Sequence, residues 1–187
     1  MYPALILAGG ASKRMGRNKA TMVVEGVPMI VRVAHALRNA GCQSILVAVR
    51  NGFQRREIMS VLSHLSDVQY ILDNDLERSA KSGLRSALRE CANMGIERIQ
   101  LAPCDTPWIL PHVFERLQEG SKPVMMPKGE RLQPLLSLVE VNVVLSALEG
   151  AEMRSSLRNT LRSVPCQIVE FADASCFRNI NASSDLN

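Results

Sequence analysis

Four cationic side chains follow a glycine pair near the start of the chain. The pair, Gly9-Gly10, ends an apolar run from Ala4 to Ala8, and the cations after it are Lys13, Arg14, Arg17 and Lys19. Glycines let a backbone approach a ligand and present its N–H groups, and cations around such a loop favour the phosphates of a nucleotide. A strand ending in a turn with solvated charges is the alternative. The combination of features favours a phosphate-binding loop, with Arg14 and Lys19 as phosphate ligands.

Two common phosphate motifs do not describe this loop. A P-loop requires Lys-Ser/Thr directly after its last glycine, whereas Gly16 is followed by Arg17-Asn18. A dinucleotide fingerprint requires three spaced glycines that open a helix, and Gly9-Gly10 with Gly16 does not provide that spacing. Within the loop, Ser12 could donate its hydroxyl to a phosphate or could support the turn.

A carboxylate stands where another apolar run, from Ile99 to Ala102, is broken by prolines. The segment reads Pro103-Cys104-Asp105-Thr106-Pro107. Mg²⁺ usually binds through one or two carboxylates plus substrate phosphates, so Asp105 beside a phosphate loop is a candidate metal ligand. Capping of the turn is the alternative for Asp105. Cys104 could suggest a nucleophile, but the histidines stand in helical contexts with no pairing visible in the sequence.

The periodicity predicts the elements that position these residues. Short apolar runs predict strands at 4–8, 44–49, 68–72 and 99–102, and 3.6-residue patterns predict helices at 29–39, 53–64, 80–94 and 111–118. Such alternation favours a parallel sheet covered on both faces. Ligands bind at the carboxyl ends of parallel strands, so Asn51 and Asp73, which follow two of the strands, should lie near Gly9 and Asp105. Polar turns are an equal explanation for Asn51 and Asp73.

The last third of the chain is more irregular. We expect strands at 123–126, 135–139 and 167–171, helices at 141–148 and 155–161, and a short β-prone run earlier, at 21–24. We predict one domain over residues 1–187. Its nucleotide-binding part covers about 1–120 and its acceptor-binding part about 121–187.

Composition and charge limit the class of protein. The 187 residues are 47% hydrophobic and 21% charged, as in a soluble globular protein. No apolar run approaches the ~20 residues of a membrane span, so we expect a cytoplasmic protein. The five cysteines are widely spaced, which predicts free thiols. The net charge of +4 would suit nucleic acid, but aromatic residues for base stacking are few.

The first loop resembles a known family. Leu7-Ala8-Gly9-Gly10-x-Ser12-x-Arg14-Met15-Gly16-x-x-Lys19 is similar to the signature of nucleotidyltransferases, and most similar to the molybdenum cofactor guanylyltransferases. The resemblance implies a three-layer α/β/α Rossmann-like fold with a mostly parallel sheet, of the nucleotide-diphospho-sugar transferase type. It also implies Mg²⁺ at Asp105 and GTP as substrate. The implied nucleotide contacts are Leu7, Ala8, Gly9, Gly10, Ser12, Arg14, Lys19, Asn51, Asp73 and Asp105, of which Arg14, Lys19 and Asp105 are catalytic.

Two later segments extend the resemblance and two departures limit it. Asn179-Ile180-Asn181 is similar to the family's closing motif, which implies Asn181 near the metal, and Arg131 with Pro134 resembles its acceptor-binding segment. However, the family usually has Asp where this chain has Asn18. The segment from Glu77 to Leu84 looks nearer to the related cytidylyltransferases, so CTP stays possible.

These observations support one main hypothesis and several alternatives. The main hypothesis is Mg²⁺-dependent transfer of GMP from GTP to the phosphate of molybdopterin, with in-line attack on the α-phosphorus and release of pyrophosphate. CTP, or a sugar or cobinamide phosphate acceptor, is an alternative within this class. A nucleotide-binding regulatory module is a non-catalytic alternative, and nucleic acid binding is the third. We expect small-molecule partners only, no membrane, and a monomer or weak homo-oligomer.

Overall fold

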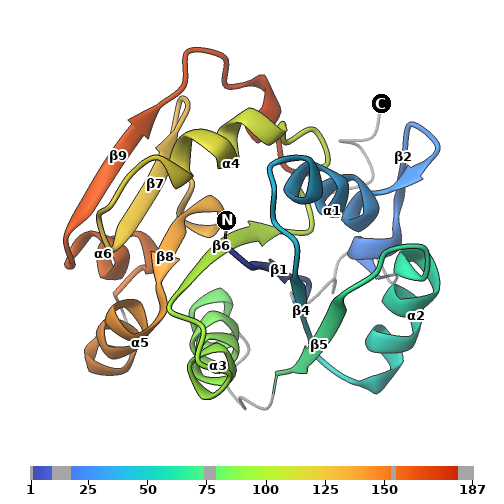
Figure 1. Ribbon diagram of the computed structural model, residues 1–187, viewed down its shortest axis with the longest axis horizontal. Coiled ribbons are helices and arrows are strands. Elements are labelled where there is room, and N and C mark those ends of the chain that lie inside the picture. The colour runs from blue at the N-terminus through green and yellow to red at the C-terminus, as the bar shows by residue number, and fades with distance from the viewer. Residues whose placement is uncertain (1, 10–17, 74–78, 153–154, 181–187) are drawn as a thin grey trace.

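A seven-stranded sheet forms the centre of the described part of the protein. The computed structural model describes residues 2–9, 18–73, 79–152 and 155–180 (Figure 1). The strand order is β5-β4-β1-β6-β8-β7-β9. Among these strands only β8 runs against its neighbours, so the sheet is mostly parallel. The strands are β1 (Ala4–Leu7), β4 (Ile45–Val49), β5 (Val68–Leu72), β6 (Arg98–Pro103), β7 (Val124–Lys128), β8 (Leu138–Glu140) and β9 (Cys166–Glu170).

Helices cover both faces of the sheet and give three layers (Figure 1). One hydrophobic core contains buried residues of α1 (Met29–Asn39), α2 (Gly52–Leu62) and α4 (Pro111–Gln118). The other contains buried residues of α3 (Ala80–Asn93), α5 (Val141–Gly150) and α6 (Leu157–Arg162). In β1, Ile6 belongs to the first core and Leu5 to the second. Because successive side chains of a strand point to opposite faces, a strand covered on both sides is expected to be apolar, as β1 and β4 are. In β6 the buried polar side chain of Gln100 donates to the carbonyl oxygens of Leu101 and Leu136.

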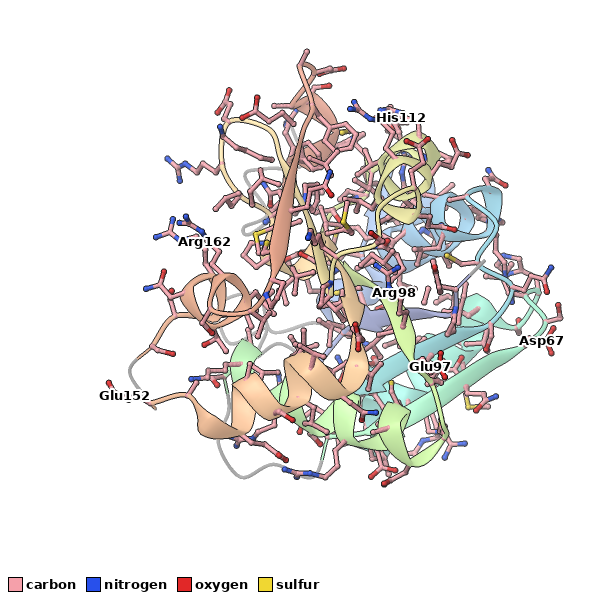
Figure 2. All side chains as sticks on the ribbon, turned by 60° about the vertical axis from the view of Figure 1, so that its left-hand side comes forward. Asp67, Glu97, Arg98, His112, Glu152 and Arg162 are labelled. Carbon is pink, nitrogen blue, oxygen red and sulfur yellow. The ribbon has the colours of Figure 1, made fainter. Side chains whose placement is uncertain are left out.

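The amino ends of the parallel strands carry structural contacts. Figure 2 labels Asp67, Glu97 and Arg98 at the amino ends of β5 and β6. Here Arg98 stacks 5.1 Å over the ring of Tyr2 and donates to the carbonyl oxygens of Gly120 and Lys122. Arg98 therefore joins the start of β6 to the segment between α4 and β7. The opposite, carboxyl edge holds the candidate residues.

Local sequence explains where the helices begin and end. The Asn51 side chain accepts a hydrogen bond from the Gln54 amide and caps α2. Ser79 and Ser82 form a capping box at the start of α3. Pro111 opens α4, where its missing N–H has no helical partner to lose. Gly41 follows α1 with φ +88°, the left-handed conformation that a glycine adopts without strain.

A small hairpin lies beside the main sheet. It consists of β2 (Val23–Val24) and β3 (Val27–Pro28), which pair antiparallel, and it follows the 3-10 helix η1 (Lys19–Thr21). The turn between the strands has positive φ at Glu25 and at Gly26. Val24 packs with Met29 and Ile180 in a third apolar cluster, so the hairpin is joined to the C-terminal segment.

The structure confirms most of the predicted elements. The strand at 68–72 and the helices at 29–39 and 111–118 have the predicted bounds. The predicted strand at 135–139 is wrong in its first half, because Pro134–Leu136 forms the 3-10 helix η2 and β8 begins only at Leu138. Pro134 has no N–H for a ladder, whereas it suits the first turn of a helix. Thr21 likewise belongs to η1 and not to the β-prone run, and the 3-10 helix η3 (Ser175–Phe177) was not predicted.

Two further expectations concern thiols and membranes. All five cysteines lie in the described part of the chain and all are free thiols, as predicted. Within the described residues, no helix combines the length and the apolar character that crossing a membrane requires.

Candidate functional site

Four parallel strands end side by side at one edge of the sheet. Leu7 of β1 pairs with Ala48 of β4 on one side and with Pro103 of β6 on the other. Val49 pairs in turn with Leu72 of β5. The segments that follow these strands contain Gly9, Arg50, Asp73 and Asp105, so the predicted convergence of strand ends is confirmed by the fold.

Lys19 and Asp105 form an ion pair at this edge. Nζ of Lys19 lies 2.7 Å from Oδ2 of Asp105, although 86 residues separate them. The side chains are 17% and 22% exposed, so each is partly shielded but accessible. The two residues proposed for phosphate and for metal therefore meet directly. The sequence indicated both residues but not their contact.

The loop that holds Asp105 is fixed from several elements. The carbonyl oxygen of Asp105 accepts a 3.0 Å hydrogen bond from the amide of Ile180. Thr106 donates its hydroxyl to the carbonyl oxygen of Pro103, and Arg32 donates Nε to that of Pro107 at 2.9 Å. The contact with Ile180 brings the C-terminal segment to the loop. Asn181, the next residue and a predicted neighbour of the metal, lies outside the described residues.

Arg50 joins the end of β4 to the end of β1. Its Nε and Nη2 each donate to the carbonyl oxygen of Gly9 over 3.2 Å. Arg50 was not predicted from the sequence, although it directly follows a buried strand just as Asp73 does. The position of Arg50 in the chain was the signal that could have identified it. Its contact with Gly9 stabilises the backbone at the start of the glycine loop.

Asp73 lies between the end of β1 and α3. A β-carbon built on Gly9 would be 3.9 Å from Oδ2 of Asp73, and one built on Gly83 would be 3.3 Å from it. The amide of Asp73 donates to Val49, which continues the β4–β5 ladder. Gly83 was not recognised in the sequence. Its lack of a side chain leaves room for the carboxylate where α3 passes the strand ends.

The other predicted residues fall into four groups. Asn51 is exposed and caps α2, which agrees with the turn explanation of this residue. Leu7 and Ala8 end β1, and the carbonyl oxygen of Ala8 accepts a 2.7 Å hydrogen bond from Gln54. Arg131 is exposed after β7, and Pro134 opens η2. Gly10, Ser12 and Arg14 lie outside the described residues.

Cys104 is not available as a nucleophile. Burial raises the pKa of its thiol to about 12, so the thiol stays protonated near neutral pH. The histidines are elsewhere: the Nε2 atoms of His35 and His64 lie 3.5 Å apart, and His112 packs 6.1 Å from Phe171. The pairing of His35 with His64 was not foreseen. His35 lies in α1, whereas His64 lies in the turn after α2 and not in the helix that its sequence context had suggested, so only the fold could reveal the pairing.

The described side chains do not by themselves form a metal-binding cluster. Among them, no group of three or more His, Cys, Asp or Glu side chains could hold a metal ion.

Comparison with known proteins identifies the family. Residues 4–168 match the MobA-like NTP transferase domain. The chain belongs to this family. A relative from Haloferax mediterranei, described as a probable molybdenum cofactor guanylyltransferase, is 32% identical to it over 195 residues, covering 97% of this chain and 90% of the relative.

Solved structures show the same fold. The molybdopterin-guanine dinucleotide biosynthesis protein A of Archaeoglobus fulgidus has a TM-score of 0.74 and 21% identity, covering 98% of this chain and 94% of that protein. Rv0371C of Mycobacterium tuberculosis in complex with manganese has a TM-score of 0.70 and 15% identity, with 91% and 87% covered. This MobA-like chain thus has the three-layer fold of the nucleotide-diphospho-sugar transferase type that its sequence predicted.

Proposed function

We propose that this protein is a molybdenum cofactor guanylyltransferase, which transfers GMP from GTP to the phosphate of molybdopterin and releases pyrophosphate. The main observation is the Lys19–Asp105 pair, which lies beside Gly9 at the carboxyl ends of parallel strands. Membership of the MobA-like family and the name of the Haloferax mediterranei relative support the choice of reaction.

Lys19, the glycine loop and Arg14 have separate roles in the proposed transfer of the nucleotide. Lys19 is a mobile point charge that can leave Asp105 for the triphosphate when a nucleotide enters. The glycine loop provides backbone N–H groups, and Arg14 adds a planar guanidinium for the phosphates. The acceptor phosphate attacks the α-phosphorus in line with the leaving pyrophosphate. No covalent enzyme intermediate is required, since orientation and charge neutralisation lower the barrier.

Asp105 fits the role of magnesium ligand, with Asn181 as a second candidate. The carboxylate is 22% exposed, and its Oδ2 lies 2.7 Å from Nζ of Lys19, so it faces a positive charge and stays accessible to a ligand. Mg²⁺ bound there would neutralise phosphate charge and help pyrophosphate to leave. The manganese complex of the structural neighbour Rv0371C supports a divalent cation in this fold.

In this proposal, the last third of the chain binds the acceptor, molybdopterin. Strand β7 has the same direction as β6, because β8 between them is antiparallel to both. The segment after β7, with Arg131 and Pro134, therefore follows a strand that ends at the same carboxyl edge of the sheet as β6. We call this edge, where the nucleotide is proposed to bind, the nucleotide edge. We assign residues 1–120 to the nucleotide and 121–187 to the acceptor.

One reconstitution assay tests the reaction and the base. The purified protein is incubated with molybdopterin, Mg²⁺ and either GTP or CTP, and the dinucleotide and pyrophosphate are both measured. The proposal expects the guanine dinucleotide together with an equal amount of pyrophosphate. A product from CTP alone would make the protein a cytidylyltransferase. Tight GTP binding without pyrophosphate release for any phosphorylated acceptor would instead indicate a regulatory module.

A further inference from the structure

Gln54 is a buried polar residue that connects three segments of the nucleotide edge. It lies in the first turn of α2 and is 9% exposed. Its Nε2 donates to the carbonyl oxygen of Ala8 at 2.7 Å and to Oδ1 of Asn18 at 3.3 Å, and its Oε1 accepts from the amide of Arg50 at 2.8 Å. One amide thus joins the end of β1, the end of β4 and the residue before Lys19. This connection was not predicted from the sequence.

Asn18 uses both ends of its own amide. Oδ1 accepts from the amide of Ala20, which caps η1, and from Gln54, each at 3.3 Å. Nδ2 donates to Oε2 of Glu57 at 3.1 Å. The backbone carbonyl of Asn18 also accepts from the amide and the hydroxyl of Thr21. Because the oxygen faces donors and the nitrogen faces a carboxylate, the surroundings determine the orientation of the amide.

We propose that Gln54, Asn18 and Glu57 are positioning residues that hold η1 so that Lys19 faces the phosphate site. We call them the positioning network. Lys19 directly follows Asn18 and is the first residue of η1, so the direction of its side chain depends on how Asn18 is held. The network acts through Lys19 and does not touch the reacting atoms. This inference rests on the proposed role of Lys19 in binding the triphosphate.

The network explains why this chain has an amide at position 18, where the family it resembles usually has Asp. A carboxylate there could still accept from Ala20 and Gln54. Its second oxygen, however, would meet the Glu57 carboxylate at a separation of 3.1 Å in the present geometry. Two ionised carboxylates at that distance repel each other, or one must bind a proton. The carboxylate of Glu57 therefore favours an amide at position 18, and a carboxylate at position 18 should require a neutral side chain at position 57.

A double-mutant cycle tests this pairing with the full-length protein. Asn18→Asp should weaken the binding of GTP with Mg²⁺ about tenfold, the size expected for losing a hydrogen bond to a charged group. Adding Glu57→Gln to the same chain should restore affinity to nearly that of the wild type, because the amide introduced on α2 can donate to the carboxylate introduced before Lys19. Isothermal titration measures the affinity. Asn142→Asp, which adds the same charge at an exposed position of α5, is the matched control and should bind like wild type.

A second readout does not depend on the reaction. Hydrogen exchange of the Ala20 and Thr21 amides reports how firmly η1 is held, and it needs no ligand. It should be faster in Asn18→Asp and in the isosteric Gln54→Glu, and normal in the double variant and the control. If the double variant is as impaired as Asn18→Asp in affinity and exchange, or if Asn18→Asp behaves like wild type in both, the inference is wrong. A wild-type protein that binds no nucleotide would overturn the proposed function, and the exchange data would still decide whether the network holds η1.

Discussion

At the residue scale, we expect the Lys19–Asp105 pair to contribute little to the stability of the fold and much to the proposed reaction. The pair is partly exposed, so solvent screens it and its contribution to folding is small, at most about 1 kcal/mol for pairs of this kind. Its contribution to the proposed reaction is much larger, because charges in the transition state must be balanced by groups already in place.

The first prediction concerns Asp105→Asn. This change keeps the shape of the side chain but removes the charge that would hold the metal and pair with Lys19. We expect turnover to fall by about 10²-fold or more, with little change in the unfolding midpoint. A pyrophosphate-release assay and thermal unfolding measure the two effects. Wild-type turnover in Asp105→Asn, or in the more severe Asp105→Ala, would exclude the assigned role.

The second prediction concerns Gly83, in the third helix of the fold. Gly83 is partly buried, and replacing a helical glycine by alanine stabilises the helix itself by about 1 kcal/mol. A β-carbon at Gly83 would lie 3.3 Å from Oδ2 of Asp73, so the carboxylate must move by a few tenths of an ångström. We therefore expect Gly83→Ala to keep or raise the unfolding midpoint and to raise the KM for GTP. Thermal unfolding and steady-state kinetics measure these effects, and an unchanged KM would show that the position of Asp73 does not matter for the nucleotide.

At the scale of elements, the β2–β3 hairpin is joined to the loop that holds Asp105. Trp108 donates its indole N–H to Oε1 of Glu25 at 3.2 Å, and Arg32 pairs with Oε2 of Glu25 at 2.8 Å. Arg178 stacks 4.7 Å over the Trp108 ring. Arg32 also donates to Pro107, so the same side chain contacts both hairpin and loop. These contacts explain how a short hairpin, which would not be stable alone, keeps a fixed place beside the site.

The third prediction follows from the titration of Glu25. The hydrogen bond from Trp108, together with Arg32, lowers the pKa of Glu25 below its usual 4.5 in the folded protein. The ionised carboxylate therefore stabilises the fold above the unfolded-state pKa, and this stabilisation is lost as the pH falls through the lower, folded-state pKa. Wild type should thus unfold at a higher temperature than Glu25→Gln at pH values above the usual pKa of Glu25, and the difference should disappear once the pH has fallen below the lowered, folded-state pKa. Fluorescence of Trp108, the only tryptophan, reports the transition. A difference that persists in acid would contradict this assignment.

At the scale of the whole molecule, two hydrophobic cores on opposite faces of the sheet contain most of the thiols. Burial raises the pKa of Cys42 to about 11 and that of Cys91 to about 12, and Cys104 is also buried. Cys42 lies in the core that contains α1 and Cys91 in the core that contains α3. Cys166, at the edge strand β9, is partly exposed.

The fourth prediction concerns the accessibility of these thiols to a reagent, which reports whether the two hydrophobic cores stay closed. A thiol reagent at neutral pH should modify Cys166 well before the other four cysteines, because those four are buried and Cys166 is partly exposed. Burial also raises the pKa of the Cys166 thiol, so accessibility decides the order. Mass spectrometry of the labelled protein gives the order of modification, and Cys166→Ser should remove the fast phase. Rapid labelling of Cys42 or Cys91 in the native protein would mean that a core opens readily.

Local patterns in the sequence determined the elements and the chemical character of the site. Short apolar runs between polar turns predicted the strands, and the 3.6-residue periods at 29–39 and 111–118 specified helices with the observed bounds. Parallel strands place their carboxyl ends at one edge, so Gly9, Asp73 and Asp105 could be predicted as neighbours. Charge indicated the four cations of the loop, and the resemblance to the nucleotidyltransferase signature singled out Lys19 among them.

Contacts between distant segments were decided only by the tertiary structure. The ion pair of Lys19 with Asp105 and the hydrogen bonds of Gln54 to Ala8 and Asn18 join residues that lie far apart in the chain. No local period encodes such a contact, because it depends on how the strands order themselves and on which helix face reaches the site. Within the segment predicted as a strand at 135–139, the side chain of Gln100, from the neighbouring strand β6, likewise donates to the carbonyl oxygen of Leu136. Sequence thus determined the chemistry at each strand end, and packing decided which groups touch.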